Sequence, residues 1–453
     1  MLFAELESRD VAIWGFGRES RVALDALRKR FPTKPLTLYC NHEEAESARA
    51  AIDDKVRVIE AAPDANALAS HEIVVKSPGI SAYKPEMISA QQRGTRFTSG
   101  TALWFGENPH ARVVAVTGTK GKSTTTAMIA HCARALGVRT ALAGNIGLPL
   151  LGLDGQRADL WAIELSSFQT GDAGAVELGV IVSLEEEHLD WHGTRERYLA
   201  DKLKLADVSG SLLVNAHAPL LMQRTAAHPQ RLIFGNPDGW HVADGVIRHG
   251  NLRVIEASAL PVPGAHNAAN ACAALAAIET LGFDARAAAA ALRAFKPLPH
   301  RLQKLGARED IDWVDDSIAT TPTAGLAALQ SLHGRVVTLI LGGFDRGLEW
   351  EDFARELSLH PPHAVIVQGA NAPRILGALR TAQVACQIVQ CDDLVAAVDR
   401  ARALGAKGGV VLLSPGAPSF DQFRDYAQRG RAFAALAGFD AAALGEIEGL
   451  GIA

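Results

Sequence analysis

The sequence predicts an α/β protein of three domains, and three observations lead to this fold class. Short runs rich in Val, Ile and Leu alternate with Ala- and Leu-rich helical stretches along almost the whole chain. The runs are continuously apolar, which is typical of parallel strands covered by helices on both faces of a sheet. The chain has 453 residues, which is too long for one ordinary hydrophobic core.

The predicted strands are short. In chain order they read VAIWGFG, LTLYC, HEIVVKSPG, RVVAVTG, DLWAIELSS, LGVIVSL, GSLLVNA, VVTLILGG, HAVIVQG and GGVVLLSPG. Helical patterns such as ESRVALDALRKRF and HNAANACAALAAIETLG lie between them. Two segments interrupt the alternation, at residues 98–108 and at the proline-stiffened KPLPHR of residues 296–301. These breaks predict domains of residues 1–103, 104–297 and 298–453, which are ordinary domain sizes.

Composition and charge exclude several classes of function. The net charge of −5 and the isoelectric point near 6.3 argue against a nucleic-acid surface, which needs a basic field. No apolar stretch approaches the ~18 residues of a membrane helix, and the acidic start MLFAELESRD has no secretory signal. The five cysteines show no metal-ligand spacing and predict a reducing compartment. We therefore expect a monomeric cytoplasmic protein with neither nucleic acid nor membrane as a partner.

A glycine-rich turn in VVAVTGTKGKSTTTAMIAHCARALG predicts a phosphate site. Gly118 and Gly121 separate an apolar strand from a helix that begins near Lys122, so backbone N–H groups and the helix dipole point at one spot. Lys122 would place a cation on the β- and γ-phosphates of ATP, and Ser123 or Thr124 would offer a hydroxyl to magnesium. Valine stands where the strict pattern has its first glycine, so an ordinary strand–turn–helix connection is the alternative.

Further motifs follow in a fixed order. They are VKSPGIS (75–81), GTKGKST (118–124), NIGLP (145–149), ELSSFQ (164–169), EHLD (187–190), ADKLKLA (200–206), GAHNAAN (264–270), LPHR (298–301), DDS (315–317) and LLSPGAPSFDQF (412–423). This succession resembles the Mur ligase family, and within it most closely the members that add glutamate to UDP-N-acetylmuramoyl-L-alanine. The resemblance spans all three predicted domains.

The resemblance implies an ATP-dependent acid–amino-acid ligase of cytoplasmic peptidoglycan-precursor synthesis. ATP would phosphorylate the carboxylate of the muramoyl-alanine substrate, and the glutamate amine would attack the resulting acyl phosphate. A Rossmann-like N-terminal domain would bind the UDP substrate, and a central P-loop domain with a parallel sheet would bind ATP. A Rossmann-like C-terminal domain would bind glutamate.

By the same resemblance, a set of residues around the glycine turn and further along the chain would bind ATP. They are Gly118, Thr119, Lys120, Gly121, Lys122, Ser123, Thr124, Asn267, Arg301 and Asp316. Of these, Arg301 could reach the phosphates through its planar fork, and Asp316 would hold ribose hydroxyls.

Two magnesium sites are implied, with oxygen-rich ligands that suit a hard cation. The residues concerned are Ser123, Glu164, His188 and Lys202. Lys202 would act as a carbamate formed from carbon dioxide, which turns a cation into an anion, and the spacing after Tyr198 favours it over Lys204. Lys122, His188 and Lys202 would be the catalytic residues. His188 and His192 also have the spacing of a zinc pair, but no HExxH motif surrounds them, so zinc is not predicted.

The UDP substrate and glutamate are assigned residues in the same way. Those for the UDP substrate are Gly15, Phe16, Gly17, Arg18, Ser77, Gly79, Asn145 and Ser166. A GxGxxS turn is also found in dinucleotide oxidoreductases, but the second strand ends Tyr39-Cys40-Asn41 without the acidic residue that binds ribose. Those for glutamate are Thr321, Arg346, Ser419 and Tyr426.

The predicted glutamate pocket departs from the pattern of ligases that use D-glutamate. Ile318 and Arg346 each replace a lysine, Thr321-Pro322 replaces an asparagine, and Tyr426 replaces a phenylalanine. Losing a cation beside a dicarboxylate is costly, so the carboxylate contacts must be rebuilt. This favours L-glutamate as the substrate, with the D-glutamate-adding ligase as the alternative. A ligase similar to folylpolyglutamate synthase and a P-loop regulatory ATPase are more remote alternatives.

Overall fold

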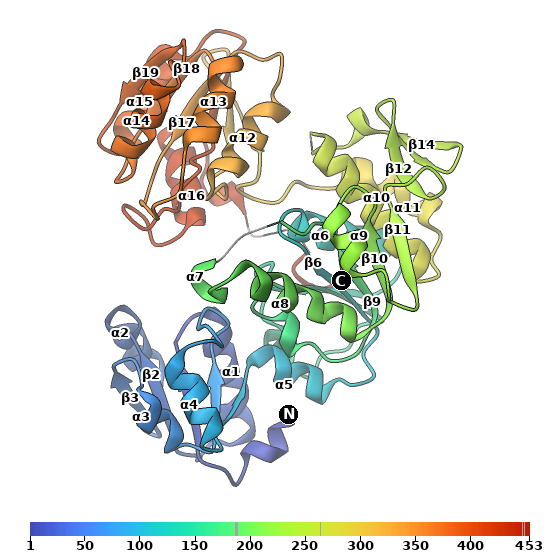
Figure 1. The fold of residues 1–453 in the computed structure, drawn as a ribbon, viewed down its shortest axis with the longest axis vertical. Coiled ribbons are helices and arrows are strands. Elements are labelled where there is room, and N and C mark those ends of the chain that lie inside the picture. Colours follow the sequence, from blue (N-terminus) through green and yellow to red (C-terminus); the bar gives the residue numbers. More distant parts are fainter. Residues whose placement is uncertain (186–188, 263, 446, 448) are drawn as a thin grey trace. The chain divides into compact units, whose positions relative to one another are not determined.

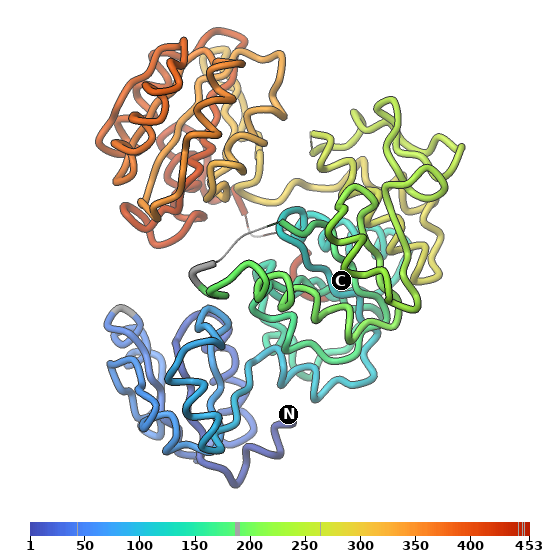
Figure 2. The backbone as a smooth tube through the Cα atoms, viewed as in Figure 1, coloured from blue at the N-terminus to red at the C-terminus, as the bar shows by residue number. Residues whose placement is uncertain are grey.

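The computed structural model describes residues 1–185, 189–262, 264–445, 447 and 449–453. The chain divides into two compact units. Figures 1 and 2 trace the chain from its N-terminus in blue to its C-terminus in red. The first comprises Met1–Pro261, His266–Phe295 and Gly449–Ala453, and the second comprises Val262–Ala265 and Lys296–Glu448.

The first unit begins with a five-stranded parallel sheet in the order β3-β2-β1-β4-β5. Its strands are β1 (Val11–Trp14), β2 (Leu36–Cys40), β3 (Val56–Glu60), β4 (Ile73–Lys76) and β5 (Arg96–Thr98). The connecting helices are α1 (Arg18–Arg30), α2 (His42–Ala51), α3 (Ala65–Ala69) and α4 (Pro85–Gln92), after a short 3₁₀ turn η1 (Phe3–Leu6). Because strand side chains alternate between faces, Val11 and Ile13 share a core with α1, whereas Ala12 and Trp14 share one with α3 and α4.

A second, seven-stranded sheet has the order β11-β10-β9-β6-β8-β7-β21, and only β21 in it is antiparallel to its neighbour. Its strands are β6 (Val113–Thr117), β7 (Thr140–Gly144), β8 (Leu160–Glu164), β9 (Val176–Ile181), β10 (Ser209–Asn215), β11 (Arg231–Phe234) and β21 (Gly451–Ile452). The α-helices of this part are α5 (Gly100–Glu107), α6 (Lys122–Ala135), α7 (Leu189–His192), α8 (Arg195–Asp207), α9 (Pro219–Arg224), α10 (Ala265–Thr280) and α11 (Ala285–Ala291). The 3₁₀ turns are η2 (Leu150–Leu153), η3 (Thr170–Asp172), η4 (Ala257–Ala259) and η5 (Leu292–Ala294). A small antiparallel sheet is formed by β12 (Trp240–Ala243), β13 (Val246–His249) and β14 (Leu252–Glu256).

The second unit contains a six-stranded sheet in the order β15-β16-β20-β17-β18-β19, with β15 antiparallel. Its strands are β15 (Gln303–Arg308), β16 (Ile311–Asp315), β17 (Val337–Leu341), β18 (Ala364–Val367), β19 (Gln387–Gln390) and β20 (Val410–Leu413). Its helices are α12 (Pro322–Ser331), α13 (Glu351–Leu359), α14 (Ala372–Thr381), α15 (Leu394–Leu404) and α16 (Tyr426–Leu436), followed by the 3₁₀ turn η6 (Ala442–Leu444). Buried residues form a separate core on each face of this sheet.

The α/β class with predominantly parallel sheets is confirmed. The predicted boundary between residues 103 and 104 falls inside α5, and the residues before and after it belong to one compact unit, so this boundary stays a prediction. The last residues were expected with the third domain, but β21 pairs with β7 in the first unit. Among the helices of the described segments, none is both long and apolar enough to cross a membrane.

Candidate active site

The glycine turn connects β6 to α6, and its two glycines are required by close packing. Gly118 has φ +152°, and a Cβ there would lie 2.5 Å from Val182 Cγ2. Gly121, which precedes α6, has φ +82°, and a Cβ there would lie 2.5 Å from Asn270 Oδ1. The turn therefore brings backbone close to neighbouring segments and leaves the N-terminus of α6 at its end, an arrangement that suits a phosphate.

The lysine and hydroxyls of the turn are arranged around this helix end. Lys122 Nζ donates to the carbonyl of Thr119 at 3.0 Å, so its side chain folds back over the turn. Thr124 is only 2% exposed, whereas Ser123 is half-buried and is therefore the more accessible hydroxyl. Lys120 is exposed, and its backbone N–H donates to Ser183 Oγ at 2.8 Å.

Glu164 ends β8 directly beside β6 and is 1% exposed. Its Oε1 accepts from Asn145 Nδ2 at 3.0 Å, while its Oε2 is buried without a hydrogen-bond partner in the described segments. A buried carboxylate oxygen without a partner is costly, and a bound cation removes that cost. Glu164 therefore fits the magnesium role that was predicted for it. His188 lies outside the described residues.

Helix α8 presents Lys202 to the glycine turn. Lys202 is 2% exposed, and its Nζ donates to the carbonyl of Gly118 at 2.8 Å. One turn earlier, Tyr198 OH lies 2.8 Å from Thr119 Oγ1. The Lys204 side chain is 50% exposed and its Nζ lies 2.6 Å from Asp201 Oδ1. Of the two lysines, Lys202 is the one that contacts the turn.

The N-terminal part of α10 also reaches the turn. Asn267, predicted from the sequence, is 4% exposed, and its Oδ1 accepts from Asn270 Nδ2 at 3.3 Å. Asn270 lies against Gly121 and was missed. The signal was present in HNAAN, because residues three apart share one face of a helix.

The predicted UDP-substrate residues lie in two groups within the first unit. Gly15 and Gly17 flank Ser77, since a Cβ on either would approach the Ser77 side chain. Arg18 donates to the carbonyl of Gly147 at 2.7 Å, and Gly79 is exposed in the loop after β4. The Phe16 N–H donates to a Glu44 carboxylate oxygen at 3.0 Å, a contact not foreseen from the sequence.

The second group follows β7 and β8. Asn145 is exposed beside Glu164, and the N–H and hydroxyl of Ser166 both donate to Gln169 Oε1. Gln169 in turn donates to Glu19 of α1 at 3.2 Å. Burial raises the pKa of Glu19 to about 7, although nearby Arg18 and the Gln169 hydrogen bond oppose this rise.

In the second unit, Asp316 is 5% exposed and accepts hydrogen bonds from Ser414 Oγ at 2.7 Å and from Leu302 N–H at 3.1 Å. Burial raises the pKa of Asp316 to about 7. Arg301 lies near this carboxyl group, and its buried Nε has no hydrogen-bond partner among the described residues. The N–H of Arg301 Nε could therefore donate a hydrogen bond to an anionic ligand.

The predicted glutamate residues lie in segments that follow β16, β17 and β20 of the same unit. Thr321 caps α12, Ser419 is 2% exposed, and Tyr426 begins α16. Arg346 is exposed, with its guanidinium 5.6 Å from the centre of the Phe420 ring.

One residue of the second unit was missed. Arg429 is 1% exposed and donates to the carbonyls of Ser317 and Ala417 at 2.8 and 2.9 Å. It thereby ties the DDS turn to the SPGAPS turn, and burial lowers its pKa to about 10.

The glycine turn, the lysine at the start of α6 and the buried carboxylate beside it define the class: a nucleotide-binding α/β protein of the P-loop type. Two family models match the chain, the Mur ligase middle domain over residues 116–278 and the Mur ligase glutamate ligase domain over residues 300–417.

Relatives of full length are similar to this chain. The UDP-N-acetylmuramoyl-L-alanine–L-glutamate ligase of Xanthomonas euvesicatoria pv. vesicatoria is 49% identical over 468 residues, with 100% of both chains covered. The enzyme of the same name from Micromonospora is 37% identical, with 96% of this chain and 97% of the relative covered. The chain belongs to the Mur ligase family.

Solved structures support the fold. The UDP-N-acetylmuramate-alanine ligase of Thermotoga maritima has a TM-score of 0.59 at 18% identity, covering 94% of this chain and 98% of its own. MurF from Acinetobacter baumannii has a TM-score of 0.60 at 17% identity, covering 93% of this chain and 90% of its own.

Proposed function

We propose that this chain is an ATP-dependent ligase that joins L-glutamate to UDP-N-acetylmuramoyl-L-alanine in peptidoglycan-precursor synthesis. The observation that carries the proposal is 47–49% identity over the full length of relatives that bear this name. The departures of Ile318, Arg346 and Tyr426 from the D-glutamate pattern agree with it.

The chemistry proceeds in two steps. A carboxylate oxygen of the UDP substrate attacks the γ-phosphorus, the bond to the bridging oxygen of ATP breaks, and ADP leaves. The amine of glutamate then attacks the acyl phosphate, loses a proton, and expels inorganic phosphate. Lys122 and the N–H groups at the start of α6 would hold the phosphates in line and offset their charge.

Magnesium would neutralise charge on the transferred phosphoryl oxygens. Glu164 Oε2 and the Ser123 hydroxyl would hold it, and we infer two such sites, with His188 at the second. Lys202 as a carbamate would add an anionic oxygen, and its burial beside the Gly118 carbonyl supports its choice over Lys204.

We assign the UDP substrate to the loops that follow β1, β4, β7 and β8 in the first unit. Glutamate is assigned to the second unit, around Thr321, Arg346, Ser419 and Tyr426. ATP would use the glycine turn and Asn267, together with Arg301 and Asp316.

The test offers purified protein ATP, Mg²⁺, UDP-N-acetylmuramoyl-L-alanine and either enantiomer of glutamate. We expect phosphate release with L-glutamate to be at least ~10-fold faster than with D-glutamate. The wrong enantiomer would place its α-carboxylate away from its partner, and the loss of a buried charged contact costs several kcal/mol. Mass spectrometry of the product checks that an amide bond has formed.

Faster release with D-glutamate would identify the D-glutamate-adding ligase instead. Steady ATP hydrolysis without UDP substrate and amino acid would identify a regulatory ATPase.

A further inference from the structure

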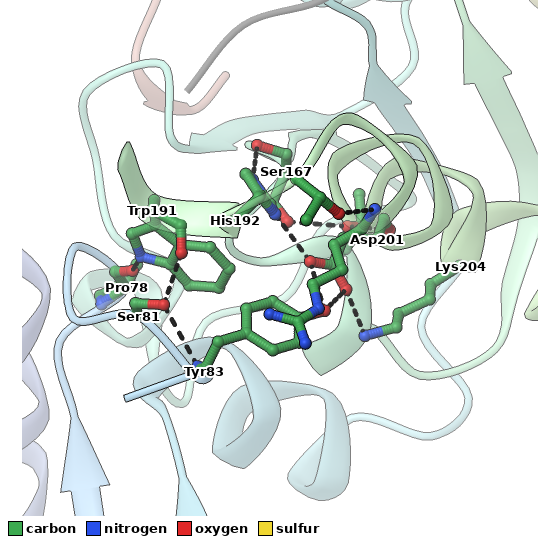
Figure 3. A network of polar contacts seen from close by, with 11 residues as sticks. Pro78, Ser81, Tyr83, Ser167, Trp191, His192, Asp201 and Lys204 are labelled. Atoms are coloured by element: carbon green, nitrogen blue, oxygen red, sulfur yellow. Dashed lines mark hydrogen bonds and ion pairs between the residues drawn. The ribbon is translucent and has the colours of Figure 1, made fainter. Parts of the chain in front are cut away.

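A buried polar network in the first unit joins three segments that carry proposed site residues (Figure 3). Its centre is Asp201 of α8, which is 4% exposed. The segments are residues 77–83 after β4, the loop after β8, and the α7–α8 hairpin. None of the site residues assigned above explains this network.

Asp201 accepts hydrogen bonds from three sides. Tyr83 OH lies 2.9 and 2.8 Å from its two carboxylate oxygens. Its Oδ2 lies 2.7 Å from Nδ1 of His192, which must donate because a carboxylate only accepts. Lys204 Nζ completes the set at 2.6 Å.

His192 also contacts the loop after β8. Its Nε2 lies 3.0 Å from Ser167 Oγ, so a serine, a histidine and an aspartate follow one another in the order of a hydrolytic triad. His192 is 0% exposed and Ser167 is 4% exposed, so this serine is closed to a substrate. The arrangement therefore positions segments and does not supply a nucleophile.

The loop after β4 is held at a second point. Trp191 Nε1 donates to the carbonyl of Pro78 at 3.0 Å, and Ser81 Oγ donates to the carbonyl of Trp191 at 2.5 Å (Figure 3). The Phe168 ring stacks on Trp191 with a centroid distance of 4.7 Å. The UDP-substrate loop, with Ser77 and Gly79, is thus fastened to the residues that precede α8.

Asp201 and Lys202 are consecutive residues of α8, so contacts that hold Asp201 also determine where Lys202 lies. Consecutive helical residues point about 100° apart, so Asp201 faces Tyr83 while Lys202 faces the Gly118 carbonyl. Thr170 Oγ1 also donates to the Asp201 carbonyl at 2.7 Å, which fixes the helix backbone at this point.

We propose that Tyr83, His192 and Asp201 are positioning residues. Their hydrogen bonds connect α8 to the UDP-substrate loop and thereby fix the position of Lys202. Loss of the Tyr83 hydroxyl removes the hydrogen bond from the substrate loop to Asp201, which loosens α8 and, through Lys202, its contact with the glycine turn. Misplacement by about 1 Å lowers catalysis by about 10²-fold, so the effect belongs to kcat. The inference rests on the proposed function in one respect: the kinetic test measures the ligation reaction proposed above.

The test compares Tyr83→Phe with Tyr39→Phe. Tyr39 is a matched control, since it is buried in the first sheet and its hydroxyl also bonds a buried side chain, His71 Nε2 at 3.0 Å. For Tyr83→Phe we expect kcat to fall by about 10- to 100-fold, with KM for UDP-N-acetylmuramoyl-L-alanine within about twofold of the parent. Tyr39→Phe should retain kcat.

Hydrogen exchange followed by mass spectrometry supplies a readout without any reaction. Tyr83→Phe should speed amide exchange in residues 116–124 and 195–207 of the protein alone, whereas Tyr39→Phe should not. Retained kcat and unchanged exchange would overturn the proposal, and a raised KM with unchanged kcat would assign Tyr83 to direct substrate binding instead. If the parent fails to join glutamate, the proposed function fails, while the exchange comparison still decides the inference.

Discussion

At the residue scale, two of the assigned side chains, Glu164 and Arg301, each have a buried polar atom with no hydrogen-bond partner in the part of the chain that the structure describes. Glu164 Oε2 is such an atom, two strand positions from a glycine turn that would hold phosphate. Its partner oxygen is fixed by Asn145, so the carboxylate is held in one orientation before any cation binds. This is preorganisation of a charged ligand by a neutral neighbour.

The substitution Glu164→Gln tests this orientation. It keeps an acceptor for Asn145 but removes the charge, so we expect the stabilisation of the protein by Mg²⁺ and ADP to disappear. Ligation should fall by about 10²-fold, which corresponds to about 3 kcal/mol of charge stabilisation. Thermal unfolding with and without Mg²⁺ and ADP measures the first effect. The exposed Glu256→Gln is the control, and a Mg²⁺-dependent shift that persists in Glu164→Gln would contradict the assignment.

At the element scale, continuously apolar runs made the parallel strands predictable. All ten predicted runs contain strands of the three large sheets, because a strand buried on both faces leaves a run that no surface helix shares. Among the strands outside these runs, β3, β12 and β14 have exposed faces that break the run with polar residues, as in VRVIE, whereas β7 (TALAG) is buried but contains small residues.

The residues of the site also differ in how well the sequence predicts them. Lys122, Ser123 and Glu164 are recognisable because each stands at a fixed place next to a strand or helix end. The bond between His192 and Asp201 joins two helices across a turn at Gly193, and periodicity within one helix cannot reveal it. In the sequence, Asp201 cannot be distinguished from the other polar residues of α8, because its contacts with Tyr83 and His192 are visible only in the structure.

Helix α1 carries a prediction about pH. Glu19 lies in its first turn, and burial raises its pKa to about 7 from 4.5. The folded state therefore binds this proton more tightly than the unfolded state, and stability is lost as the pH rises from about 4.5 to about 7. Glu19→Gln resembles the protonated form, so it should be the more stable protein above pH 7, by on the order of 3 kcal/mol.

Denaturant unfolding at pH 4.5 and pH 8 checks this expectation. The two proteins should unfold at nearly the same denaturant concentration at the lower pH and separate at the higher. The exposed Glu46→Gln should follow the parent at both values. A stability difference of equal size at both values would mean that the Glu19 side chain acts by packing and not by its charge.

At the scale of the whole molecule, most of the second unit is one continuous segment, Lys296–Glu448, after which the chain returns to the first unit at Gly449. The return is a short strand. β21 pairs with β7, the N–H of Thr140 donates to the Ala453 carbonyl at 2.8 Å, and Arg134 donates to the Gly451 carbonyl at 2.9 Å. The β21 strand therefore covers an edge of the sheet that also carries Glu164, one strand further in.

Removal of residues 449–453 should destabilise the first unit alone. About three net hydrogen bonds are lost, each contributing about 1 kcal/mol, so the unfolding free energy of that unit should fall by about 3 kcal/mol. Hydrogen exchange measures both units in one protein: amides of β7 and β8 should exchange faster, while those of β17 and β20 serve as an internal control and should not change. Faster exchange in both units would show that β21 stabilises the molecule as a whole, and unchanged exchange in β7 would show that the pairing contributes nothing to stability.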